Sequence, residues 1–166
     1  MSTFVQGPMR GWRFAGSAPQ DFTCEVQAGA PRLCSKGDAP TGFATLMQTF
    51  AADDYCGRRV RWRATLRVRG VGGEGAGLWA RVDGPLGEVL AFDNSAGRRR
   101  KGTASESPSA VVIDVPPRAV SVSLGVLIDG PGEVWISDAG FEVVDASVPL
   151  TADPLPRAPQ NLGFTG

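Results

Sequence analysis

The stretch that decides the fold is VRWRATLRVR, which runs from Val60 to Arg69. Its even positions carry apolar side chains, and its odd positions carry polar side chains that are all arginine except Thr65. Strict alternation with period two predicts a β-strand with one face in a core and the other in water. The same alternation returns between Val120 and Ile128. We therefore expect a chain built from half-buried strands that pack face to face.

Other segments of the chain show the same strand-like composition, separated by breaks rich in Gly, Pro and Asp. Further strands are predicted at 11–14, 22–27, 43–50, 78–83, 88–93, 111–115, 133–136 and 141–144, with breaks or loops at 30–31, 37–42, 70–75 and 95–108. No window has a convincing helical period. The sequence predicts an all-β fold, an antiparallel β-sandwich of the jelly-roll type with about nine to eleven strands.

The length of 166 residues suits a single domain. We expect one β-sandwich over residues 1–145, followed by an extended, Pro-rich C-terminal tail over residues 146–166. The N-terminus does not resemble a signal peptide, and no apolar run is long enough to span a membrane. These features predict a cytoplasmic protein without membrane contact, and they do not indicate its oligomeric state.

Charge and composition narrow the classes of function. The 17 basic and 17 acidic residues cancel, which argues against a nucleic-acid partner. The chain has no histidine, so catalysis by Ser-His or Cys-His pairs and imidazole metal sites are excluded. The three cysteines, none in a C-x-x-C motif, favour free structural thiols, with a Cys24–Cys34 bridge across a hairpin as the alternative.

Several motifs occur in an order that resembles a known family. These are GLWARVDG at 77–84, LAFDN at 90–94, KGT at 101–103 and VWISD at 134–138. The order resembles bacterial β-sandwich domains similar to galactose-binding and carbohydrate-binding modules, of the kind appended to AraC-type transcriptional regulators and some peptidases. The resemblance implies a jelly roll with one concave sheet open to a ligand. It also implies a structural calcium ion, for which Asp53 and Asp138 are the weak candidates, and no other cofactor.

Trp79 and Arg81 are two residues apart on one predicted strand, so they point the same way. If that face is open, an indole beside a guanidinium can stack against a sugar ring and bind its polar groups. The alternative is that Trp79 belongs to the core and that Arg81 pairs with a nearby carboxylate. We expect Gln48, Arg63, Phe92 and Asp93 to contribute to the same site. The predicted ligand is a small organic molecule or a sugar, bound without catalysis.

Two clusters of basic residues have both a functional and a structural interpretation. Arg61, Arg63 and Arg67 could line a groove for an anion, but we favour a solvated face balanced by carboxylates of neighbouring strands. The run RRRK at 98–101 could contact phosphate, but we favour an exposed loop.

A cofactor-free cyclase or isomerase of a biosynthetic pathway is the alternative function. It would shape a polyene or polyketide-like substrate by proximity and oriented hydrogen bonds. Its cavity would be lined by Trp12, Phe43, Met47, Trp79 and Phe92, and Arg81, Asp93 or Tyr55 would polarise a carbonyl. A deep apolar pocket closed by the tail would favour this function, and an open polar groove would favour binding.

Overall fold

The structure is a computed structural model that describes residues 5–6, 9–27, 29–152, 158–159 and 161–165. These residues form ten strands and two short 3₁₀ helices, and neither helix is long and apolar enough to cross a membrane. The elements are β1 (Val5–Gln6), β2 (Arg13–Gly16), η1 (Pro19–Asp21), β3 (Phe22–Gln27), β4 (Ala30–Ser35), β5 (Phe43–Ala51), η2 (Asp53–Tyr55), β6 (Arg58–Asp83), β7 (Val89–Asp93), β8 (Arg100–Val115), β9 (Ser121–Asp129) and β10 (Glu133–Val144). All the pairings are antiparallel, so the predicted fold class is confirmed.

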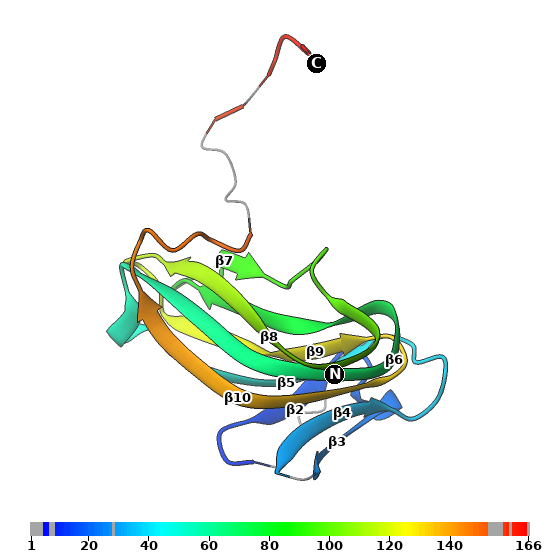
Figure 1. Cartoon of the computed structure of the whole chain (residues 1–166). Coiled ribbons are helices and arrows are strands. Elements are labelled where there is room, and N and C mark those ends of the chain that lie inside the picture. The colour runs from blue at the N-terminus through cyan, green and yellow to red at the C-terminus, as the bar shows by residue number, and fades with distance from the viewer. Residues whose placement is uncertain (1–4, 7–8, 28, 153–157, 160, 166) are drawn as a thin grey trace.

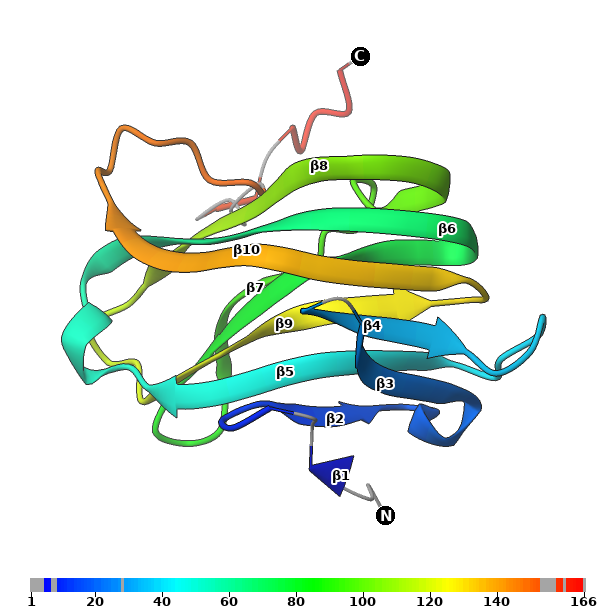
Figure 2. The same cartoon turned by 60° about the horizontal axis from the view of Figure 1, so that its bottom comes forward.

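The long strand β6 belongs to both layers of the sandwich. Its first part, from Arg58 to Arg69, pairs with β8 and β10, whereas its last part, from Gly75 to Asp83, pairs with β9 and β7. The first layer therefore has the order β8-β6-β10-β4-β3, and the second has the order β7-β6-β9-β5-β2-β1. Figures 1 and 2 show β6 curving round one end of the sandwich from one layer to the other.

The predicted loop at 70–75 is wrong, because β6 and β8 stay paired through the bend. Gly70, Gly73 and Gly75 have φ angles of +61°, +60° and +94°, which glycine adopts readily. A Cβ on Gly73 would also meet the carbonyl oxygen of Asp129 at 2.8 Å. The glycine-rich segment therefore bends the strand without ending it.

Three other sequence predictions are also corrected. Residues 100–108, predicted as loop, form the polar part of β8, whose backbone pairs with β6 while most of its side chains lie in solvent. The predicted break at 30–31 is the start of β4. The strands predicted at 133–136 and 141–144 are one strand, with a bulge between Ser137 and Gly140. In each case the strand extends through a stretch whose composition is typical of a loop or turn.

The core lies between the two layers and follows the predicted alternation. The even positions from Val60 to Val68 are at most 3% exposed. The second layer contributes inward-facing side chains such as Leu46, Leu78 and Ile128 to the same cluster. Burial of these apolar side chains is the main stabilising contribution to the sandwich.

The odd-numbered side chains of the first half of β6 face outward and meet carboxylates of the neighbouring strands. Arg59 bonds Asp114 of β8, Arg61 and Arg63 bond Glu142 of β10, and Arg69 bonds Glu133 of β10. The hydrogen bond from Arg61 is the main cause that lowers the pKa of Glu142. The prediction that this stripe is balanced by carboxylates is confirmed for Arg61 and Arg63, whereas the third predicted member, Arg67, stacks on the ring of Trp135 in β10.

Candidate functional site

The outer face of the second layer carries Trp79 and Arg81, as their spacing predicts. Trp79 lies opposite Gly125 of β9, which lies opposite Met47 of β5. Arg81 lies between Ser123 of β9 and Phe92 of β7. This face therefore brings together side chains from four strands that are distant in sequence.

Trp79 is not the exposed platform that its position suggested. Trp79 is only 7% exposed, and its side chain packs in a small cluster with Met47 and Leu127. Its Nε1 donates a hydrogen bond of 2.8 Å to Oγ1 of Thr45, which in turn donates to the carbonyl oxygen of Val126. The indole is thus held in one orientation and forms part of a floor.

A cavity of about 330 Å³, called here the outer hollow, lies over that floor. Aromatic, basic, acidic and amide groups line it together: Phe43, Trp79, Arg81, Phe92, Asn94, Arg99, Leu127 and Asp129. Phe92 is 50% exposed, so its ring is accessible to a ligand in a way that the Trp79 ring is not.

The polar groups of the outer hollow are held by neighbouring residues. Nε of Arg81 bonds the Asp83 carboxylate at 3.1 Å, and the Arg81 side chain remains 40% exposed. Nε of Arg99 donates to the backbone carbonyl of Asn94, and its Nη1 lies 4.0 Å from Oδ2 of Asp129. Donors and acceptors therefore surround an aromatic surface, an arrangement suited to a polyhydroxylated or acidic ring.

Asn94, Arg99 and Asp129 were not predicted from the sequence. Arg99 stood in the basic run that was interpreted as solvated loop, and Asp129 ends a strand that was identified only by its apolar residues. An asparagine and an aspartate beside strand ends are common in turns, so their sequence context carried no signal for a site.

Asp93 is a structural anchor. It is buried and accepts hydrogen bonds from Arg98, from the backbone N–H of Ser95 and from Oγ1 of Thr151 at 2.5 Å. It lines a separate cavity of about 300 Å³ beside Phe92 and Asn94. Its carboxylate is therefore occupied by protein groups.

Gln48 and Tyr55 lie away from the outer hollow. Both line a cavity of about 530 Å³, called here the aromatic cavity, which also contacts the inward-facing Trp62. Gln48 is on β5, where its neighbours Met47 and Thr49 face outward and Gln48 faces the other layer. Arg63 lies on the outer face of the first layer and bonds Glu142. The structure thus places the predicted site residues in four regions: the outer hollow, the cavity beside Asp93, the aromatic cavity and the outer face of the first layer.

The two calcium candidates also lie in different elements. Asp138 occupies the bulge of β10 with a φ of +51°, and Asp53 begins η2. Among the residues that the structure describes, there is no group of three or more His, Cys, Asp or Glu side chains that could hold a metal ion. Calcium binding stays a prediction.

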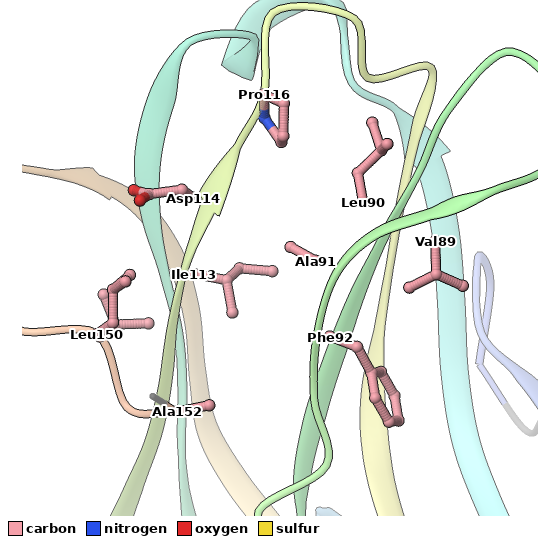
Figure 3. Close-up of a pocket in the computed structure, with 10 residues that line it drawn as sticks. Val89, Leu90, Ala91, Phe92, Ile113, Asp114, Pro116, Leu150 and Ala152 are labelled. Atoms are coloured by element: carbon pink, nitrogen blue, oxygen red, sulfur yellow. The ribbon is translucent and has the colours of Figure 1, made fainter. Parts of the chain in front are cut away.

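A fourth cavity, of about 400 Å³, lies between β7 and β8 and is here called the strap cavity. Figure 3 shows Ile113 pointing from β8 toward Ala91 of β7, with Leu150 and Ala152 on the segment beside β8. That segment, residues 146–152, is called the strap. The apolar lining of the strap cavity resembles the pocket expected of a cyclase. However, none of the three predicted catalytic residues, Arg81, Asp93 and Tyr55, lines this cavity.

Comparison with known proteins gives one relative by sequence. No family model matches the chain. The chain is 37% identical over 174 residues to the uncharacterized HTH-type transcriptional regulator YbfP of Bacillus subtilis. The alignment covers 98% of this chain but only 59% of the regulator, so the chain spans less than two thirds of its relative.

Comparison with solved structures places the fold. The enzymatically active domain of tailspike protein 4 of bacteriophage CBA120 has a TM-score of 0.59 at 15% identity, over 81% of this chain and 20% of that chain. The CBM22-1 xylan-binding domain from Paenibacillus barcinonensis has a TM-score of 0.57 at 12% identity, over 89% of this chain and 95% of that domain. The chain thus has the jelly-roll β-sandwich fold found in carbohydrate-binding modules.

Proposed function

We propose that this chain is a non-catalytic module that binds a carbohydrate or a related small polar molecule in the outer hollow. The observation that carries the proposal is the combination of groups there: the accessible ring of Phe92 beside the guanidinium of Arg81, with Asn94, Arg99 and Asp129 around them. A sugar offers an apolar ring face and a rim of hydroxyl groups, and this lining can contact both.

The comparisons support the proposal in two ways. The matched module from Paenibacillus barcinonensis is a xylan-binding domain with the same fold. The regulator from Bacillus subtilis suggests the setting in which such binding would be useful. We infer that this chain senses a small ligand for a transcriptional regulator, in keeping with the predicted AraC-type association.

Binding is favoured over the alternative of a cyclase or isomerase. That function needed Trp12, Phe43, Met47, Trp79 and Phe92 in one cavity. Trp12 instead lines the aromatic cavity, whereas Phe43, Trp79 and Phe92 line the outer hollow. The apolar strap cavity has no lining group among those expected to polarise a carbonyl.

Isothermal titration calorimetry with xylo-oligosaccharides, galacto-oligosaccharides and uronic acids tests the proposal. Phe92→Ala and Arg81→Ala should each weaken binding about tenfold or more, because each removes one of the two contact types. The matched controls are Leu86→Ala and Arg118→Ala, which change an apolar and a basic side chain that are exposed away from the hollow. Both controls should bind as the unmodified protein does.

Two results would overturn the proposal. One is the absence of saturable binding for every compound in the panel. The other is binding that Phe92→Ala and Arg81→Ala leave unchanged while both variants keep the thermal stability of the parent.

A further inference from the structure

The aromatic cavity has a composition unlike that of the outer hollow. Five aromatic side chains line it: Trp12, Phe50, Tyr55, Trp62 and Phe141. Tyr55 is the only tyrosine in the chain. The volume of about 530 Å³ is enough for a small organic molecule.

The aromatic rings form two packed groups. Phe50, Tyr55 and Phe141 contact one another edge to face, with ring centroids 5.0 to 5.7 Å apart. The ring centroids of Trp12 and Trp62 lie 6.1 Å apart, and Nε1 of Trp62 donates a hydrogen bond to the carbonyl oxygen of Gly125. These contacts hold the rings in place before any ligand arrives. Aromatic faces carry negative electrostatic potential, so such walls attract cations.

The polar groups of the aromatic cavity point to the same ligand class. They are the Gln48 amide, the Asp54 carboxylate and the Tyr55 hydroxyl, and none of these has a hydrogen-bond or ion-pair partner among the described residues. Within the described part of the chain, no lysine or arginine lines the cavity. An anionic ligand would meet an uncompensated carboxylate there, whereas a cation would meet both a carboxylate and aromatic faces.

We propose that the aromatic cavity is a second binding site, specific for a compact organic ammonium cation. Asp54 supplies the opposing charge, the aromatic rings surround the alkylammonium group, and Gln48 and Tyr55 bind a hydroxyl or carbonyl group of the same ligand. The site lies on the inner side of β5 and the outer hollow on its outer side, so this proposal does not depend on sugar binding.

Choline chloride is the probe, and calorimetry with tryptophan fluorescence is the measurement. Choline should bind saturably and at least about fivefold more tightly than the neutral alcohol in which a tert-butyl group replaces its trimethylammonium group. Asp54→Asn should weaken choline binding about fivefold or more and remove most of that discrimination. Asp38→Asn, at an exposed aspartate outside the cavity, and Phe92→Ala, in the outer hollow, should leave choline binding unchanged.

Three outcomes would overturn the proposal. Choline would fail to bind, or the neutral alcohol would bind equally well, or Asp54→Asn would bind choline as tightly as the parent. Asp54 is exposed, so its amide variant is expected to fold, and a thermal melt verifies this. If the parent protein bound choline but none of the sugars, only the function proposed for the outer hollow would be contradicted.

Discussion

Gly125 lies where two tryptophans approach β9. Trp62 donates its indole hydrogen bond to the Gly125 carbonyl oxygen at 3.0 Å. A Cβ at this position would lie 3.0 Å from Nε1 of Trp79 and 2.4 Å from the carbonyl oxygen of Leu46. The absent side chain is thus what allows the floor of the outer hollow to pack against the strand.

Gly125→Ala should lower the free energy of unfolding by about 1–3 kcal/mol, because the backbone of β5 cannot move away without disturbing its pairing with β9. The measurement is urea unfolding followed by tryptophan fluorescence. Gly37→Ala is the matched control, since its Cβ would meet nothing within 4 Å. Equal stability of the two variants would contradict the assigned close contact.

Glu133 is the one acidic residue of the first layer that is both buried and shared between two arginines. It is 8% exposed and accepts hydrogen bonds from Arg32 and from Arg69 at 2.5 Å. Burial opposes its ionisation, but the bonds from Arg69 and Arg32 outweigh burial and lower its pKa. Beside it, Arg67 stacks on Trp135 with its guanidinium carbon 3.9 Å from the ring centroid.

Glu133→Gln should destabilise the fold at neutral pH by about 1–3 kcal/mol, because two guanidinium groups lose a charged acceptor. The folded-state pKa lies below the ordinary value of 4.5, so the stabilisation is complete above that pH and is lost as the pH falls through the folded-state pKa. The free energies of unfolding of the parent protein and of Glu133→Gln should therefore converge as the pH is lowered. Urea unfolding curves at a series of acidic pH values measure them. A constant difference at all pH values would contradict this account.

At the scale of the elements, the strap shows how a segment without regular structure is held against a sheet. Arg59 bonds Asp114 through Nε and Nη2, and its Nη1 donates to the carbonyl oxygens of Ala146 and Val148. Thr151 bonds the backbone of Val112 and the carboxylate of Asp93. A side chain at each end thus replaces the strand pairing that the strap lacks.

Arg59→Lys should loosen the strap, because an ammonium group cannot reproduce the fork that joins one carboxylate and two carbonyl groups. Hydrogen exchange should become about three- to tenfold faster for amides of residues 146–152, while the core of β6 stays protected. Arg61→Lys makes the same chemical change two residues away and should leave the strap unaffected. Unchanged exchange in Arg59→Lys would show that Thr151 alone holds the segment.

At the scale of the whole molecule, the sandwich is held together without disulfides. Cys24, Cys34 and Cys56 are all free. In the β3–β4 hairpin Cys34 lies opposite Thr23, and Cys24 lies opposite Leu33, so the two thiols point to opposite faces. A bridge between Cys24 and Cys34 is thus ruled out by register. Burial raises the pKa of Cys24 to about 11, which keeps this thiol protonated and unreactive.

The midpoint of thermal unfolding should therefore be the same with and without a reducing agent, to within about one degree. Calorimetry at neutral pH, with thiol titration of the native and unfolded protein, makes the comparison. A clear drop in the midpoint on reduction would mean that a disulfide forms despite the register.

The candidate site was predictable only in part. Spacing along one strand placed Trp79 and Arg81 on a common face, and hairpin adjacency brought Phe92 beside Arg81. Gln48 was assigned to the same face but belongs to the other one, because the sequence does not tell which parity of β5 points inward. Asp93 was assigned to ligand binding, but the structure pairs it with Arg98 and Thr151.

The sequence by itself determined the all-β class, the buried face of the arginine strand and the exclusion of histidine chemistry. These follow from period-two patterning and composition, which act locally along the chain. Only the tertiary structure decided that β6 continues through its glycines into the second layer, and that the candidate residues are divided between several cavities and the outer face of the first layer. Such outcomes depend on which strands pair, and pairing is a relation between distant segments that no single stretch of sequence contains.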